Sequence, residues 1–225
     1  MGEQRHLEVP FAEKEQAKAI GARWDRAARR WYVPPEVDPM PFARWTREPL
    51  VGLPGEDRQY GGKALFVDLV PSSCFFTNVR THVASADWDR LRRFVYARAG
   101  SACEICGARH DPAAQAWAGD GRTRRLDAHE RWSYDTVRLV QRLQRIICLC
   151  FECHQATHYG RTSLYGDADA AFEHLARANA WSDEATNAHI DAAFDEWERR
   201  NAWAWALDLS IILDAGMRLR DARRP

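Results

Sequence analysis

The sequence predicts an α+β protein made of a small N-terminal module and a larger C-terminal domain. Three observations support this. Residues 1–48 hold short strand patterns around one helix pattern, a loop rich in proline and glycine follows at 49–62, and residues 63–225 hold two cysteine pairs among helical and strand patterns. A chain of 225 residues has room for one ordinary domain and a small one. A composition of 46% hydrophobic and 28% charged residues excludes a disordered or collagen-like protein.

The first 48 residues predict a βαββ order. Hydrophobic residues alternate over 7–11 as in a short strand, and residues 12–20 are rich in helix formers before Gly21. Two further short strands are expected at 23–24 and 31–33, joined by a basic turn. The module is therefore expected to be a miniature sheet with one helix.

The larger domain is expected to contain several helices and two strands. The apolar run at 64–70 suits a buried strand, and tryptophan and leucine alternate with other residues over 203–211 as in a strand. Apolar residues at helical spacing and suitable caps predict helices at 85–99, 135–145, 151–159, 168–178 and 183–200.

Charge is balanced overall but unevenly placed. The net charge of zero argues against a purely electrostatic nucleic-acid binder. Residues 80–145 hold 13 arginines against 8 acidic residues, whereas residues 162–215, which include the acidic helical part at 167–215, hold 3 arginines against 11 acidic residues. No run of about 18 apolar residues and no signal-peptide pattern occurs, so we expect a cytoplasmic protein without a membrane partner.

Four of the six cysteines form two Cys-x-x-Cys pairs, Cys103 with Cys106 and Cys150 with Cys153. In a chain expected to be intracellular, such paired motifs more often bind zinc than form disulfides. Two thiolates three positions apart can reach one tetrahedral ion, so we expect the four cysteines to hold a structural zinc ion. Cys74 and Cys148 are expected to be buried small hydrophobes.

Three histidines accompany these pairs. His154 follows Cys153 directly, and His158 comes four residues later, so a helix over 151–159 would place both imidazoles on one face. His129 lies in the 43-residue segment between the cysteine pairs. A lone histidine is usually a surface or core residue, but three at this spacing predict a second metal site.

The order of these residues resembles that of HNH endonucleases of the zinc-knuckle type. That family's pattern runs C-x-x-C-G, then a strand ending in a histidine pair, then L-C-x-x-C-H-x-x-x-H. Residues 103–107 match the first part, 149–158 match the last, and His129 matches the first histidine of the pair. The resemblance covers 98–160 and implies a ββα-metal, treble-clef-like fold. A wider stretch, 65–213, is similar to an uncharacterised bacterial group of HNH-like proteins.

The resemblance implies a metal-dependent endonuclease or nickase that hydrolyses DNA phosphodiester bonds. A catalytic divalent ion, Mg²⁺ or another, would be held by His129 and His154 together with His158, or His158 would instead bind the phosphate directly. Two features depart from the family pattern: Glu130 stands where the general-base histidine is usual, and the asparagine normally found before the second cysteine pair has no counterpart. We expect Glu130 to orient or deprotonate the attacking water, or to join the metal site.

Arginines near the motif are expected to contact the phosphates of double-stranded DNA, and the candidates are Arg124, Arg125, Arg131, Arg142 and Arg145. The solvated face of a helix explains Arg142 and Arg145 equally well. The alternative function is a non-catalytic zinc-binding module that binds nucleic acid or a protein, which Glu130 and the acidic C-terminal part favour. The nuclease requires two ions per chain, whereas the binding module requires one.

The N-terminal module resembles a short module of unknown function that is often attached to plasmid-type primases. The resemblance rests on residues 9–11, 13–14, 17–18, 21–25 and 31–34. Its lysine, arginine and tryptophan side chains could stack on or neutralise nucleic acid. We expect Trp24 and Trp31 instead to form the core of this small module.

Overall fold

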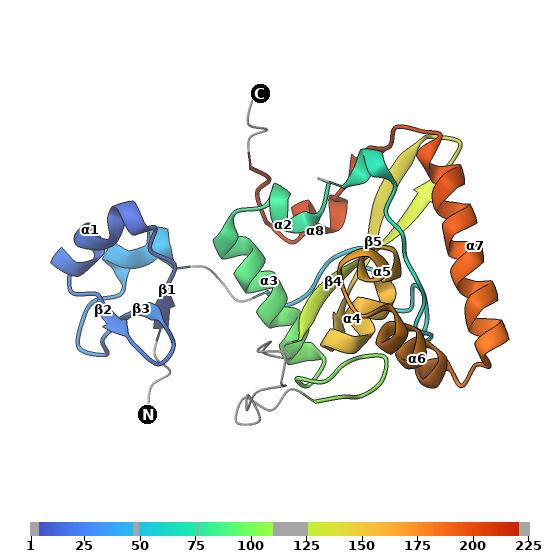
Figure 1. Ribbon diagram of the computed structural model, residues 1–225. Coiled ribbons are helices and arrows are strands. Elements are labelled where there is room, and N and C mark those ends of the chain that lie inside the picture. Colours follow the sequence, from blue (N-terminus) through green and yellow to red (C-terminus); the bar gives the residue numbers. More distant parts are fainter. Residues whose placement is uncertain (1–4, 47–49, 76, 110–125, 221–225) are drawn as a thin grey trace. The chain divides into compact units, whose positions relative to one another are not determined.

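The computed structural model describes residues 5–46, 50–75, 77–109 and 126–220. The chain divides into two compact units, Met1–Pro49 and Leu50–Pro225. Over the described residues it is α+β, with one small three-stranded sheet in each unit and helices around them (Figure 1). None of the described helices combines the length and the apolar character that crossing a membrane requires.

The first unit has the expected βαββ order. Strands β1 (Arg5–Leu7), β2 (Arg23–Asp25) and β3 (Arg30–Val33) form an antiparallel sheet in the order β1-β3-β2, and α1 (Lys14–Ala19) follows β1. Short 3₁₀ helices lie at Phe11–Glu13 and Met40–Trp45. The core is built from Leu7, Ala17, Ala22, Val33, Phe42 and Trp45.

The two tryptophans of this unit differ in burial. Trp31 packs against the core from β3. Trp24 lies on the edge strand β2, where it is 48% exposed and its ring meets that of Trp31 edge-on at 5.5 Å. The expectation of a core role is confirmed for Trp31 and is wrong for Trp24, because an edge strand leaves one flank of its residues uncovered.

The second unit is built around a long hairpin. Strands β4 (Asp127–Asp135) and β5 (Val140–Leu149) pair antiparallel, with a bulge between Arg131 and Trp132, and β6 (Ala206–Asp208) adds in parallel to the start of β5. Helix α3 (Ser85–Arg98) packs on both long strands. The end of β5 leads directly into helix α4 (Phe151–Thr157), which packs back on the hairpin (Figure 1).

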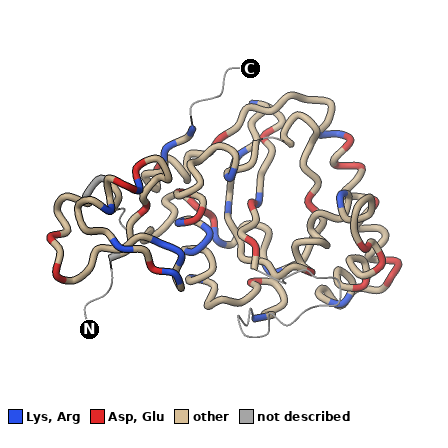
Figure 2. The backbone as a smooth tube through the Cα atoms, turned by 60° about the vertical axis from the view of Figure 1, so that its left-hand side comes forward, with Lys and Arg blue, Asp and Glu red and all other residues tan. Residues whose placement is uncertain are grey.

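The remaining helices surround this centre. The short helix α2 (Val79–His82) precedes α3, and α5 (Tyr159–Tyr165) follows α4. Helix α6 (Ala168–Asn179) packs on α4 and α5, α7 (Asp183–Asn201) packs on α6, and α8 (Ser210–Asp214) packs on β5. Acidic residues recur along α7 (Figure 2). The predicted helices at 85–99, 151–159, 168–178 and 183–200 are confirmed with small shifts at their ends.

The predicted helix at 135–145 is wrong, because this segment is the tip of the hairpin and the first half of β5. The Asp135 carboxylate accepts hydrogen bonds from the amides of Val137 and Arg138, at 3.0 and 2.9 Å, which fixes the turn. The strand then continues into the apolar run Ile146, Ile147, Cys148 and Leu149, which is buried on both faces. Spacing alone fits a helix, but the turn and this run favour a strand.

The predicted strand at 64–70 is also wrong. This segment is not paired in a sheet, and helix side chains satisfy its amides. The amide of Leu65 donates to Asn179 Oδ1 and that of Val67 to His189 Nε2, both at 3.0 Å. The predicted strand at 203–211 is shorter than expected, because only Ala206–Asp208 pairs and α8 begins at Ser210.

Candidate metal centres

The four cysteines of the two pairs lie together. Cys103 and Cys106 come from the loop after α3, whereas Cys150 and Cys153 belong to the start of α4. Their sulfur atoms all lie within 4.8 Å of one another, and the Sγ atoms of Cys106 and Cys150 are 3.6 Å apart. A tetrahedral zinc ion with Zn–S bonds of about 2.3 Å separates its sulfurs by about 3.8 Å. The cluster is therefore suited to a metal ion such as zinc.

Local backbone structure positions these sulfurs. Gly107 has φ +74° and its amide donates to the Cys103 carbonyl at 3.0 Å, which closes the first loop. Cys150 is the N-cap of α4, and its Sγ accepts a hydrogen bond from the Cys153 amide at 3.5 Å. A helix N-terminus favours negative charge, so it stabilises the thiolate form that binds metal.

Without a metal ion, the thiols of the cluster compete for their protons, so only one of Cys103, Cys150 and Cys153 favours the thiolate form. Hydrogen bonds from the thiols of Cys150 and Cys153 lower the pKa of Cys103 well below its usual range. The thiols of Cys150 and Cys153 donate hydrogen bonds to the Cys103 sulfur, which stabilises their protonated form and raises their pKa. A metal ion removes this competition because it takes all four sulfurs as thiolates. Cys74 and Cys148 lie outside the cluster and are buried, and burial raises the pKa of both thiols.

His174 on α6 supports the cluster from behind. Its Nε2 lies 3.1 Å from Cys153 Sγ, and its Nδ1 lies 3.2 Å from an amino group of Arg177. Arg177 is a donor only, so Nδ1 accepts and Nε2 carries the hydrogen that points to sulfur. An imidazole that donates to a metal-binding thiolate fixes its direction.

The three predicted histidines also lie together. His129 comes from β4, His154 from α4, and His158 from the junction of α4 and α5. Their ring centroids are 4.7 to 5.3 Å apart, and one nitrogen from each ring falls within a group spanning 4.8 Å. The Nε2 atom of His129 is buried without a hydrogen-bond partner among the described residues. A buried nitrogen left unpaired is costly, and a bound cation would satisfy it.

Burial keeps these imidazoles neutral. It lowers the pKa of His129 well below its ordinary value, that of His154 to about 4 and that of His158 to about 3. Neighbouring positive charge from the other histidines and from Arg161 lowers them further. Neutral imidazole is the form that ligates a metal, so the site is ready for a cation at neutral pH.

Two carboxylates on β4, those of Asp127 and Glu130, flank the three histidines. Asp127 Oδ2 lies 3.4 Å from Nδ1 of His154, a pairing that orients an imidazole and leaves Nε2 for an ion. Glu130 Oε1 accepts a hydrogen bond from the Val79 amide at 3.0 Å, and burial raises the pKa of this carboxyl. The positive charge of Arg80 partly opposes the pKa rise of both carboxyls.

A cavity of about 810 Å³ lies beside the histidines. His129, His154 and His158 line it, together with Glu130 and the exposed Arg80 and Arg161. Its other walls include apolar and aromatic side chains, among them Phe75, Trp88, Tyr165, Phe194 and Trp197. The histidine cluster therefore faces a space large enough for a substrate.

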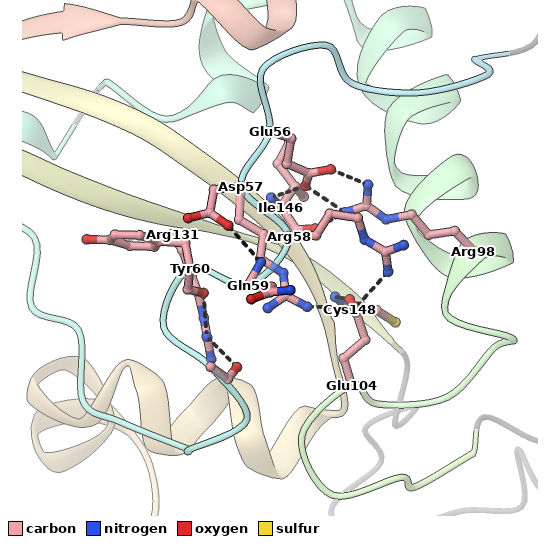
Figure 3. Close-up of polar contacts among 12 residues, drawn as sticks. Glu56, Asp57, Arg58, Gln59, Tyr60, Arg98, Glu104, Arg131, Ile146 and Cys148 are labelled. Atoms are coloured by element: carbon pink, nitrogen blue, oxygen red, sulfur yellow. Dashed lines mark hydrogen bonds and ion pairs between the residues drawn. The ribbon is translucent and has the colours of Figure 1, made fainter.

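The arginines predicted to bind phosphate mostly have partners inside the protein. Arg131 is buried, and its guanidinium donates to the carbonyl of Tyr60 (Figure 3) and to those of Gly62 and Ala64. It also lies over the Phe66 ring. Burial lowers its pKa to about 10. Arg145 is buried and donates to Glu104 Oε1 at 2.8 Å. Neither guanidinium is placed to bind a phosphate, because each is committed to internal acceptors.

The other predicted arginines differ from these. Arg142 is exposed and donates to Asp208 Oδ2 at 2.7 Å, which ties β5 to β6. Arg124 and Arg125 lie outside the described residues. Among the described residues, the cavity offers Arg80 and Arg161 as its cations.

Glu104 and Glu56 join the first cysteine loop and the preceding segment to β5 (Figure 3). Glu104 Oε2 accepts from the Cys148 amide at 2.8 Å, and its own amide donates to the Cys148 carbonyl. Glu56 binds the Arg98 guanidinium through both oxygens, at 2.5 and 2.7 Å, and accepts from the Ile146 amide. Arg98 also donates to the Ile146 carbonyl.

Sequence reasoning missed Asp127, His174 and Arg80. The position of Asp127 two residues before His129 on a strand was a usable signal, because such residues share a face. His174 lies 21 residues after Cys153, and Arg80 lies 49 residues before His129, so local spacing gives no signal for either.

Comparison with known proteins covers only the first unit. Residues 5–47 match a family described as a domain of unknown function, DUF5710. Two proteins named DNA primase TraC from Escherichia coli are 63% identical over 46 residues and 51% identical over 45 residues. Each alignment covers 20% of this chain, and 4% and 3% of the primases, respectively. No solved structure matches the chain.

Proposed function

We propose that residues 50–225 form a metal-dependent DNA endonuclease or nickase of the HNH type. The observation that carries the proposal is the meeting of three neutral imidazoles from β4, α4 and the α4–α5 junction, with one buried nitrogen of His129 unpaired among the described residues. The order of hairpin β4–β5, a four-cysteine cluster and helix α4 supports a ββα-metal arrangement.

In this proposal the two metal sites have different tasks. Zinc at the four cysteines is structural, because a fully sulfur-bound ion has no open position. His129, His154 and His158 hold a divalent ion, which when bound supplies charge stabilisation at the cleaved phosphate. Asp127 orients His154 through the 3.4 Å contact between Oδ2 and Nδ1.

The chain's own residues perform the rest of the hydrolysis. Glu130 lines the cavity beside His129, and its carboxylate is oriented by the Val79 amide. Burial raises its pKa, which makes it a stronger base for a water proton than an exposed carboxylate. Arg80 and Arg161 reach the same cavity as exposed cations and bind phosphate oxygens.

A plasmid-nicking assay tests this function. Purified full chain is incubated with supercoiled plasmid and Mg²⁺, Mn²⁺ or Ni²⁺, beside His129→Ala and the matched control His82→Ala. His82 lies on α2 outside both clusters, so we expect its variant to nick at the wild-type rate. We expect His129→Ala to lose activity and Glu130→Gln to lose about 100-fold or more, the usual contribution of a general base.

The second candidate is a non-catalytic module that binds nucleic acid or a protein through the zinc-held fold. The observation that favours it is Glu130, which stands at the base position and has one oxygen held by a backbone amide. No nicking with any ion, from zinc-loaded protein that binds DNA, would favour this module. Equal nicking by wild type and His129→Ala would indicate a contaminating nuclease and would contradict the proposal.

A further inference from the structure

The cavity beside the histidines differs from a surface that binds duplex DNA. Duplex binding relies on cations that neutralise phosphates along both strands. Here the described lining offers Arg80 and Arg161, while the acidic residues Asp68, Asp127 and Glu130 line the same space. The described lining therefore offers too few cations to neutralise the phosphates of two strands.

Aromatic side chains provide the other part of the lining. Trp88 on α3 and Phe194 and Trp197 on α7 are partly buried in its walls. Phe75 and Tyr165 are 57% and 80% exposed, so their rings are accessible to a ligand. Exposed aromatic rings beside a few cations are typical of sites that stack the bases of a single strand.

The chain direction places the Tyr165 ring within reach of the histidines, and Phe75 lines the same cavity. Helix α5 begins directly after His158 and ends at Tyr165 (Figure 1). Seven residues of helix advance about 10 Å. A base next to a phosphate bound at the histidines can cover that distance only if it is unpaired, since a paired base stays inside its duplex.

From this we infer that the cavity binds unpaired DNA, with a phosphate at the three histidines and an adjacent base stacked on the rings of Phe75 and Tyr165. The inference rests on the proposed function, because it takes the histidine cluster as the phosphate site. It adds the class of substrate, a single strand or an unpaired segment of a duplex.

Binding of a 20-nucleotide strand carrying 2-aminopurine tests the inference without cleavage. Zinc-loaded full chain carrying Glu130→Gln, which keeps the three histidines, is titrated with Mg²⁺ present, and 2-aminopurine fluorescence and anisotropy are followed for the strand and its duplex. We expect fluorescence quenching and at least tenfold tighter binding for the single strand. Phe75→Ala and Tyr165→Ala should weaken its binding about fivefold or more, as loss of a stacked base does.

Trp203→Ala is the matched control, because Trp203 is 50% exposed and is not among the residues that line the cavity. We expect it to bind like the wild type. Tighter binding to duplex, binding without quenching, or equal losses in all three variants would each overturn the inference, as would no binding at all.

A cleavage arm separates this inference from the proposed function. With Mn²⁺ added, we expect cleavage of the single strand and of a duplex with a mismatched bubble, and little cleavage of perfect duplex. Efficient cleavage of perfect duplex without quenching would overturn the single-strand inference and leave the nuclease intact. Quenching and binding without cleavage under any ion would support the base site and contradict the nuclease.

Discussion

Replacing Glu104 with glutamine tests how the first cysteine loop is held to the sheet. The Glu104 carboxylate accepts hydrogen bonds from Arg145 and from the Cys148 amide, both at 2.8 Å. The side chains of Glu104 and Arg145 are largely buried, with 13% and 8% of their surface exposed, respectively. Glu104→Gln keeps the shape and one acceptor but leaves the Arg145 charge buried without its anion. Removing one partner of a buried ion pair costs about 3–5 kcal/mol.

Urea unfolding of the zinc-saturated full chain measures this loss. Arg58→Ala is the matched control, because Arg58 is 57% exposed and reaches Glu104 only at 3.5 Å. An exposed pair contributes at most about 1 kcal/mol, so this variant should remain close to wild type. If Glu104→Gln lost no more free energy of unfolding than Arg58→Ala, the reasoning about the buried pair would be refuted.

Three further outcomes are expected. Gly61→Ala should lower the melting temperature more than Gly62→Ala does. Both positions have positive φ, but a Cβ at Gly61 would meet the Arg131 guanidinium, whereas nothing lies within 4 Å of a Cβ at Gly62. Equal decreases in melting temperature would contradict this. Cys103→Ala should lose zinc and unfold, as metal analysis and circular dichroism would show; a folded, zinc-replete variant would refute it. Burial raises the pKa of Asp68 to about 6. The folded state therefore binds this proton more tightly than the unfolded state, and the free energy of unfolding should fall by ~2 kcal/mol between pH 4 and 6 relative to Asp68→Asn; parallel pH curves for the two proteins would contradict this.

The sequence was most informative where chemistry depends on close spacing. The residues of each Cys-x-x-Cys pair, and His154 with His158, are close in sequence. The structure brings the seven predicted ligand residues together in two groups, one of four cysteines and one of three histidines. Charged residues were harder to assign. Arg131 and Arg145 read as surface cations in sequence, but their partners Tyr60 and Glu104 are more than 40 residues away.

Secondary structure failed where long-range contacts override local pattern. Residues 64–70 have the composition of a strand, yet Asn179 and His189 from distant helices bind their amides. In the hairpin, the turn at Asp135 and the pairing of His129 with Ile147 decide the conformation of a segment whose spacing also fits a helix. The amide partners of 64–70 lie more than 100 residues away, so no local window of sequence contains them, whereas the Asp135 turn is a local feature that the helical spacing outweighed in the prediction.

Metal titration tests whether the three histidines bind a divalent ion in addition to the zinc at the four cysteines. Zinc-loaded wild type, His158→Ala and His82→Ala are titrated with Mn²⁺ or Ni²⁺ by calorimetry. We expect one additional ion per chain in the wild type and in His82→Ala, and none in His158→Ala, with the cysteine-bound zinc retained in all three. Identical titrations of wild type and His158→Ala would contradict it.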